Sequence, residues 1–505
     1  MRSWLLLSSL ALAIFSANTT FTFAGSAESI EARLDRLERE NSELKKIVTR
    51  LSKERFENPV KKTTEQAGKV SSKEQAKSSP DATASGATTT QHPARANVGL
   101  IHQDSDLGYD LLDPTQAGKS KPLMILDAKK DGRLQKGVTA SGAITAIADF
   151  QKTNIDIGYL MRQPENVSGK TASEAALHSI QVGLTANISP WISAYSEILY
   201  DPEQSFASGT ITSLPRNQLQ MRKGYLLLGD LSVSPFYFQL GKIESPFGQM
   251  DTVNPFSLST DWHTFAGLSY GALVGYSKDG LNIAAEAVQG GAEFRGLNMP
   301  VEGTNIPSKL NNYVFDANYK LKFGELNSMR FGASYEAGSP YCQNFPVRHF
   351  GTCSSPNPAY SVYGEVQLDK FRLKGSFQQT LKVMPGSFNP NPPLNAFAAS
   401  KVSAFDVGGL YETMIAGKKT HLSLDYSAFI AGPSGAQWRQ QTQLVAGLAY
   451  FPMKNVKFFT EAIFIQGYAP FEFLTGGMPG PDPTALLSNA ASKTGVLIGG
   501  ITAAY

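Results

Sequence analysis

The sequence predicts an all-β protein, an antiparallel transmembrane β-barrel of about 16 strands (range 16–18), preceded by a short α-helical coiled coil and a disordered linker. Three observations lead to this fold class. Apolar and polar residues alternate along the chain from Gly137 to Tyr505, and the connections between these segments are short and long in turn. The composition fits as well, because 42% of the 505 residues are hydrophobic and only 18% are charged. We therefore assign residues 137–505 to the barrel.

Residues 1–24 predict a signal peptide. Arg2 precedes an apolar stretch from Trp4 to Phe15, and small residues suited to cleavage follow at Ala24 and Ala27. The apolar stretch is shorter than the roughly 20 residues that a membrane-spanning helix needs, and no later apolar run reaches that length. A closed β-barrel is then the remaining way for the chain to span a membrane.

Residues 28–55 predict a periplasmic coiled coil. Apolar residues recur at alternating steps of four and three, and flanking charges leave no second apolar face for docking. About three heptads are marginal alone, so contacts elsewhere must help to bring the chains together. We expect a homotrimer, although an Asn in the seam is also a feature of dimers. The seam consists of Ile30, Leu34, Leu37, Asn41, Leu44, Val48 and Leu51.

Two further segments precede the barrel. Residues 56–96 are rich in Ser, Thr, Ala, Gln and Lys and nearly lack large apolar residues, which predicts a disordered linker. Residues 97–136 regain apolar clusters such as PLMILDA without a clear period. This segment is either periplasmic or supplies a first strand.

From Gly137 onward the hydrophobic period is two, for instance in residues 154–162, 180–185, 312–321 and 329–336. One face is aliphatic with aromatic ends and the other is polar, as in a barrel with lipid outside and water inside. A soluble β-sandwich also alternates, but it would not need an aromatic residue at so many strand ends.

The connections alternate between short ones, such as QKT, SP, KDG and DK, and long ones, which is typical of outer-membrane barrels. Seventeen strands can be counted, whereas such barrels have an even number. Either PLMILDA supplies another strand, or a weak segment such as 219–228 is misassigned and 16 remain.

The stretch GKIESPFG, residues 241–248, ends an alternating strand with two charges and a proline. Gly241 allows a β-bulge that would turn Lys242 and Glu244 toward the lumen, and Pro246 would end the strand. The loop of about twenty residues that follows either folds inward and narrows the pore or lies outside, with both charges at the rim. Further pore-lining candidates on polar-face positions are Arg162, Arg330, Arg372 and Lys374.

Cys342 and Cys353 predict an intramolecular disulfide in an outer loop. The signal peptide indicates an oxidising compartment, and the short intervening segment contains Pro346 and Gly351. A zinc site that includes His349 is the alternative, but it would lack a CxxC pair. No metal site and no cofactor are expected.

The layout of the whole chain, with KPLMILDAKKDGRLQKG leading into the barrel, resembles the LbtU-type siderophore porins of iron uptake. This resemblance implies about 16 strands and passage of a ferric siderophore without the energy-coupled plug of larger receptors. GKIESPFG is also similar to the Gly-Lys/Arg-x-x-x-Pro-Phe-Gly stretch of phosphate-selective-type porins, in which a strand leads into a loop that folds into the pore.

We therefore expect an outer-membrane channel for facilitated diffusion of a ferric siderophore, with outer-membrane lipid around it. A general or anion-preferring, phosphate-type porin and an outer-membrane anchor are the alternatives. No Ser/His/acid set, carboxylate pair or metal cluster indicates an enzyme. The net charge of +3 gives no argument for nucleic acid.

Overall fold

The structure is a computed structural model that describes residues 101–103, 105–113, 115, 120–154, 169–200, 219–290, 309–342, 344, 353, 355–467 and 490–505. All of them belong to one compact unit, residues 94–505. The predicted signal peptide, the coiled coil and the linker lie outside the described residues. The same holds for nearly all of the alternating segment 154–162.

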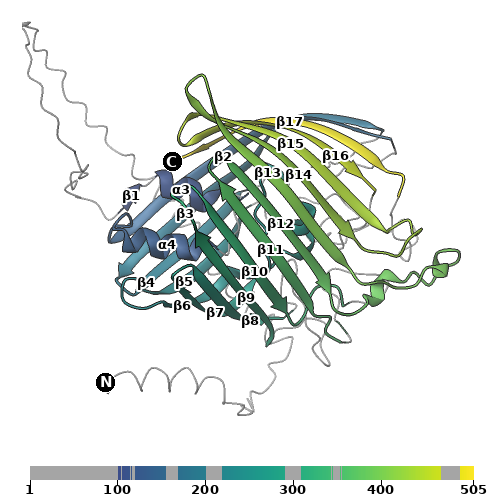
Figure 1. The fold of residues 1–505 in the computed structure, drawn as a ribbon, viewed down its shortest axis with the longest axis horizontal. Coiled ribbons are helices and arrows are strands. Elements are labelled where there is room, and N and C mark those ends of the chain that lie inside the picture. Colours follow the sequence, from purple (N-terminus) through teal and green to yellow (C-terminus); the bar gives the residue numbers. More distant parts are fainter. Residues whose placement is uncertain are drawn as a thin grey trace, which may run out of the picture. The chain divides into compact units, whose positions relative to one another are not determined.

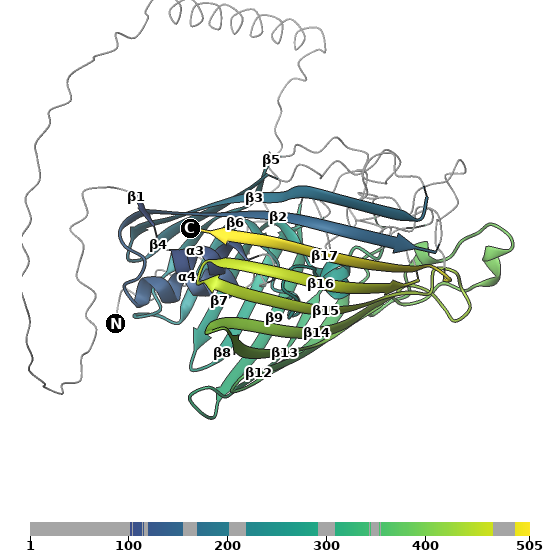
Figure 2. The ribbon, with the colours of Figure 1, turned by 90° about the horizontal axis from the view of Figure 1, so that it is seen from above.

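The chain forms a closed antiparallel barrel of 16 strands, which confirms the predicted fold class (Figures 1 and 2). Each strand from β2 to β17 pairs with the next one, and β17 pairs with β2 to close the ring. A seventeenth strand, β1 (Ile101–Gln103), runs parallel to the start of β2. The barrel strands are β2 (Gly137–Thr153), β3 (Thr171–Ser189), β4 (Ile192–Tyr200), β5 (Leu219–Gly229), β6 (Phe236–Glu244), β7 (Leu268–Lys278), β8 (Leu281–Gln289), β9 (Leu310–Lys322), β10 (Ser328–Glu336), β11 (Ala359–Leu368), β12 (Phe371–Thr380), β13 (Ser403–Ile415), β14 (Lys418–Ile430), β15 (Gln440–Met453), β16 (Val456–Gln466) and β17 (Lys493–Ala504).

The predicted count of 17 barrel strands is one too many. Neither of the two explanations offered for the odd number, a strand in PLMILDA or a misassigned segment 219–228, is correct. QKT is the end of β2, because Gln151 and Lys152 pair with β3 on one side and β17 on the other. The suspected weak segment 219–228 belongs to a true strand, β5. PLMILDA is helical, so the option that it supplies a strand is wrong.

The barrel buries polar side chains and exposes apolar ones, the reverse of a water-soluble domain. Inward positions hold residues such as Gln181, Glu197 and Asp425, each at most 5% exposed. Outward positions hold residues such as Phe150 and Leu424, which are 50% and 57% exposed. This pattern is typical of a barrel whose wall contacts lipid and whose interior is wet.

The two ends of the barrel differ in their connections. Two-residue turns such as Asp279–Gly280 join strands at one end, where φ angles of 51° and 85° fit the tight hairpin turns that match strand twist. The connections at the other end are long, for example residues 245–267 between β6 and β7. The alternation predicted from the sequence is therefore present.

Two helices, α3 (Ser105–Leu112) and α4 (Lys121–Lys130), lie inside the ring at the short-turn end (Figures 1 and 2). Pro122 in the first turn of α4 and Lys129 and Lys130 in its last turn favour a helix there. Apolar residues of both helices share one buried cluster with inward residues of the wall, among them Leu107, Leu111, Ile125, Leu126, Tyr195, Tyr225, Leu227 and Tyr237. The family resemblance implied passage without an energy-coupled plug, and the described interior contains these two helices, whose apolar faces are buried against the wall.

Short helical segments occur in the long connections: α5 (Thr260–Phe265), η2 (Pro385–Ser387) and η3 (Leu394–Ala396). Cys342 and Cys353 form a disulfide in the connection after β10, with their Cα atoms 5.3 Å apart. Sulfurs joined in this way offer no thiolates to a zinc ion.

Candidate functional site

The loop 245–267 leaves the wall at the end of β6 and crosses the barrel interior. Pro246 cannot extend the ladder, and Gly248 adopts a left-handed φ of 66° as the chain turns inward. The Gly248 N–H donates to Ser334 Oγ on β10 at 2.8 Å, while the Phe256 N–H donates to Glu461 on β16 at 2.7 Å. Of the two alternatives left open by the sequence, the inward loop is the one observed.

The far end of this loop is anchored on β16. The Glu461 carboxylate accepts hydrogen bonds from the backbone N–H groups of Phe256 and Ser257, at 2.7 and 3.0 Å. Lys457 Nζ donates to the Pro255 carbonyl oxygen at 2.7 Å. The Phe256 ring stacks on Phe459, with centroids 5.0 Å apart. These charge-assisted bonds fix the tip of the loop against the wall opposite its origin.

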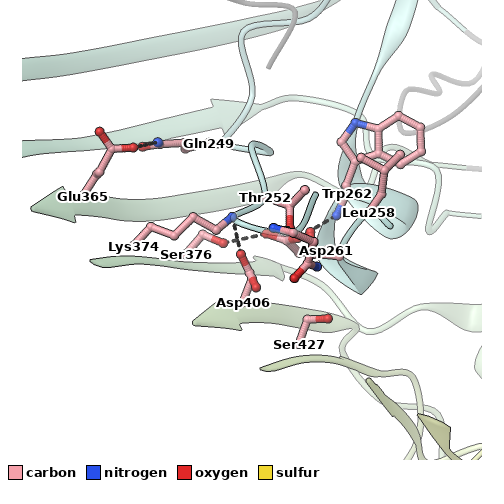
Figure 3. A network of polar contacts seen from close by, with 12 residues as sticks. Gln249, Thr252, Leu258, Asp261, Trp262, Glu365, Lys374, Ser376, Asp406 and Ser427 are labelled. Carbon is pink, nitrogen blue, oxygen red and sulfur yellow. Dashed lines mark hydrogen bonds and ion pairs between the residues drawn. The ribbon is translucent and has the colours of Figure 1, made fainter. Parts of the chain in front are cut away.

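The returning half of the loop, which contains α5, is held by polar residues on β12 and β14 (Figure 3). Ser376 Oγ donates to Asp261 at 2.6 Å, and the Thr260 N–H donates to Ser427 Oγ at 3.0 Å. Beside Asp261, Lys374 and Asp406 form a buried ion pair. Polar side chains of the wall therefore hold this part of the loop in place, next to a buried ion pair.

Apolar packing holds the two ends of the loop together. Phe247 and Phe265 lie in one buried cluster with Tyr341 and Phe429. Tyr341 also donates from its hydroxyl to the Thr264 carbonyl oxygen at 2.7 Å, and it directly precedes the disulfide. The loop therefore behaves as a packed structural element of the interior.

A second charged cluster lies where α4 meets the wall. Lys223 Nζ and Glu244 Oε2 are 2.6 Å apart, and Arg222 Nη1 and Glu197 Oε1 are 3.2 Å apart. Lys121, at the start of α4, is buried beside these two ion pairs. Burial lowers the pKa of the Lys121 ammonium from 10.5 to about 8, and the surrounding charges partly offset one another.

The structure places three of the predicted pore-lining cations on the inner face of the wall. Arg330, Arg372 and Lys374 occupy inward positions of β10 and β12. Glu244 also faces the interior, through its ion pair with Lys223. Arg162 lies outside the described residues.

Lys242 does not line the interior, so that prediction is wrong. No bulge forms at Gly241, because the register between β6 and β7 is continuous from Phe236 to Glu244. Lys242 Nζ instead lies 5.8 Å from the ring centroid of its cross-strand neighbour Tyr270, which is an outward residue. Lys242 therefore lies on the outer face, whereas Glu244, the last residue of β6, reaches the interior and forms its ion pair with Lys223 there.

Several interior charges escaped the sequence analysis. Glu197, Lys223, Asp406 and Glu461 occupy inward positions of their strands, and a systematic survey of charges on polar-face positions could have found them. Asp261 could not have been found in this way, because it lies in a loop and not in a strand. Its role depends on where the inward loop meets β12.

A cavity of about 70 Å³ lies between the start of α4 and the wall formed by β6 to β10. We call it the α4 cavity. Its lining includes Ser120 and Leu123 from the helix and Tyr237, Asn282, Asn318 and Arg330 from the wall. Within the described ranges, no group of three or more His, Cys, Asp or Glu side chains could hold a metal ion. No helix in the same ranges has the length and apolar character needed to cross a membrane.

No protein-family model matches the chain. A UPF0422 protein of Coxiella burnetii is 24% identical over 245 residues, which is 47% of this chain and 48% of that protein, so the match spans about half the length of this curated relative. An anion-selective porin from Comamonas acidovorans has a TM-score of 0.46 at 12% identity, over 74% of this chain and 100% of its own. OprB of Pseudomonas putida has a TM-score of 0.45 at 10% identity, over 72% and 94%. Similarities this low carry no argument about function.

Proposed function

We propose that the protein is a channel of the outer membrane through which a small solute diffuses down its gradient. The observation that carries this proposal is the loop 245–267, which crosses a closed barrel with a polar interior and an apolar exterior. An inward loop anchored by charges narrows the passage and defines its lining. A membrane anchor would need no such interior, so the channel is favoured over the structural alternative.

The proposed solute is a ferric siderophore, taken up without energy coupling. Its support is the resemblance in layout to the siderophore porins, including the predicted signal peptide and the predicted periplasmic N-terminal extension. A second candidate, an anion-preferring porin, is favoured by the inward cations Arg330 and Arg372 on neighbouring parts of the wall.

Conductance in planar bilayers tests the channel. Purified wild-type protein should give discrete current steps in potassium chloride. Glu461→Gln should give larger or noisier steps, because the carboxylate that holds two backbone N–H groups of the loop loses its charge. Glu412→Gln, which removes a half-exposed carboxylate from β13, is the matched control and should leave the steps unchanged. A bilayer that stays silent with folded wild-type protein would refute the channel.

Uptake into liposomes separates the two solutes. Vesicles that contain the protein are offered a labelled ferric hydroxamate siderophore, a labelled ferric carboxylate siderophore and labelled inorganic phosphate. Uptake of a siderophore at several times the rate of protein-free vesicles supports the siderophore channel. Phosphate uptake without siderophore uptake would replace it with the anion-preferring porin.

A further inference from the structure

The long connection between β10 and β11, residues 337–358, contributes a tyrosine to the packing of the inward loop. Tyr341 lies in this connection and is only 1% exposed. Its ring centroid lies 5.1 Å from that of Phe265, at the returning end of the loop, and 6.1 Å from that of Phe429 on β14. The ring therefore contacts both the loop and the wall.

The Tyr341 hydroxyl adds a directional contact to this packing. It donates a hydrogen bond to the Thr264 carbonyl oxygen at 2.7 Å. Thr264 belongs to the last turn of α5, where carbonyl groups have no partner within the helix. Because Thr264 is itself buried, the tyrosine hydroxyl satisfies a carbonyl that water does not reach.

The backbone around Tyr341 is fixed by both arms of the connection. Asn357 Nδ2 donates to the Tyr341 carbonyl oxygen at 2.6 Å, and the Ser339 N–H donates to the Asn357 carbonyl oxygen at 2.9 Å. Asn357 Oδ1 also accepts a hydrogen bond at 3.0 Å from the N–H of Lys382, just after β12. Ser339 and Asn357 are at most 2% exposed. Since buried polar groups are costly to leave unpaired, this network holds Tyr341 in one position.

The disulfide restrains the same residue from its other side. Cys342 directly follows Tyr341 and is bonded to Cys353, and both sulfur-bearing residues are at most 5% exposed. A covalent bond across a sequence separation of 11 reduces the number of conformations open to this part of the connection. Tyr341 thus lies between a hydrogen-bond network and a covalent closure.

We propose that Tyr341 is a positioning residue for the passage: it sets where the returning end of the inward loop lies, and the disulfide-closed connection after β10 keeps it there. The proposal rests on the proposed channel function. Tyr341 is buried, so it acts on a solute only through Thr264 and Phe265 of the loop. The width of the passage then depends on a connection whose key side chain does not line it.

Hydrogen–deuterium exchange of the detergent-solubilised full chain, read by mass spectrometry, tests the position of the loop. The amide hydrogens of His263 and Ala266 report on α5, because both donate to backbone carbonyl oxygens one turn earlier. Tyr341→Ala should speed their exchange by about tenfold or more, since a buried ring is removed from the packing. Tyr341→Phe keeps the ring and loses only the hydroxyl, so it should speed exchange by about twofold to tenfold.

Two further variants separate the parts of the proposal. Replacement of Cys342 and Cys353 by alanine in one chain should speed the same exchange, but by less than Tyr341→Ala, because the ring remains. Tyr335→Ala is the matched control, since it removes a tyrosine from the outer face of β10 and should leave exchange in α5 unchanged. Wild-type exchange in Tyr341→Ala, or equal acceleration in Tyr335→Ala, would overturn the proposal. Wild-type exchange in the cysteine variant would overturn the role of the disulfide.

Conductance in planar bilayers extends the test to the passage. Tyr341→Ala should give larger or more variable current steps than the wild type, and Tyr341→Phe should lie between the two. Exchange does not depend on conductance. A silent bilayer with accelerated exchange in Tyr341→Ala would therefore refute the channel alone. A conducting channel in which Tyr341→Ala changes neither the exchange nor the current steps would refute the positioning role alone.

Discussion

Lys121 places an ammonium group inside the barrel, where the residue is only 2% exposed. It lies among Glu197, Arg222, Lys223 and Glu244. Burial lowers the pKa of Lys121 to about 8, while the two neighbouring cations and the two neighbouring carboxylates partly offset one another.

This pKa predicts a pH dependence with a defined sign. Between about pH 8 and 10.5, an unfolded chain holds the Lys121 proton while the folded chain releases it. The free energy of unfolding should therefore rise with pH in this window, by up to about 3 kcal/mol from this group. Below about pH 8, Lys121 is protonated in both states and adds no pH dependence to the free energy of unfolding. Urea unfolding at pH 7.5 and pH 10 measures the difference, which should shrink in Lys121→Met.

Gly241 is a position where no side chain fits. Its φ is 144°, and an added Cβ would lie 2.3 Å from the Gly224 carbonyl oxygen on β5. Gly241→Ala should lower the free energy of unfolding by about 2 to 4 kcal/mol and reduce the folded fraction, because both atoms belong to rigid backbone. Gly495→Ala on β17, where nothing lies within 4 Å, is the control. Equal folded fractions of the two variants on unheated gels would contradict this account.

The helices α3 and α4 fill part of the interior without belonging to the ring. The ladder from β2 to β17 closes without them. Deletion of residues 105–134 should therefore leave a folded, heat-resistant barrel, and it should raise single-channel conductance severalfold because the short-turn end is no longer occupied. Unchanged conductance in the folded deletion variant would mean that the passage runs entirely beside the helices.

The strands were predictable from the sequence because a two-residue period repeats over many residues and sets the faces of the wall. The helix α4 was not, since PLMILDA is a short apolar run whose period cannot distinguish helix from strand. QKT was taken for a turn because polar residues also occupy the inward face of β2. The residues of the inward loop were found by motif, but their partners Glu461 and Ser376 depend on a path across the barrel that local patterns do not encode.

Closure of the ring leaves the 16 barrel strands without a free edge, so two barrels that touch meet through side chains of the outer wall. Ala140, Ile144, Ala146 and Ala148 occupy outward positions of β2, where small residues would let a neighbouring barrel approach closely. We expect a homotrimer. Native mass measurement and crosslinking of detergent-extracted protein, with and without residues 28–55, test this. A monomer in both forms would refute it, and a trimer that survives truncation would assign the contact to the barrel wall.

The interior helices join the barrel at Gly137, on the same side as the two-residue turns. Their connection to β2 therefore does not pass through the wall. We expect that the helices can enter a ring that has already closed, so that insertion of the barrel into the membrane and occupation of its interior are separable events. A synthetic peptide of residues 101–134, added to the deletion variant, should bind in the vacated interior and block conductance. The block should be reversible, because the peptide can exchange without unfolding the barrel.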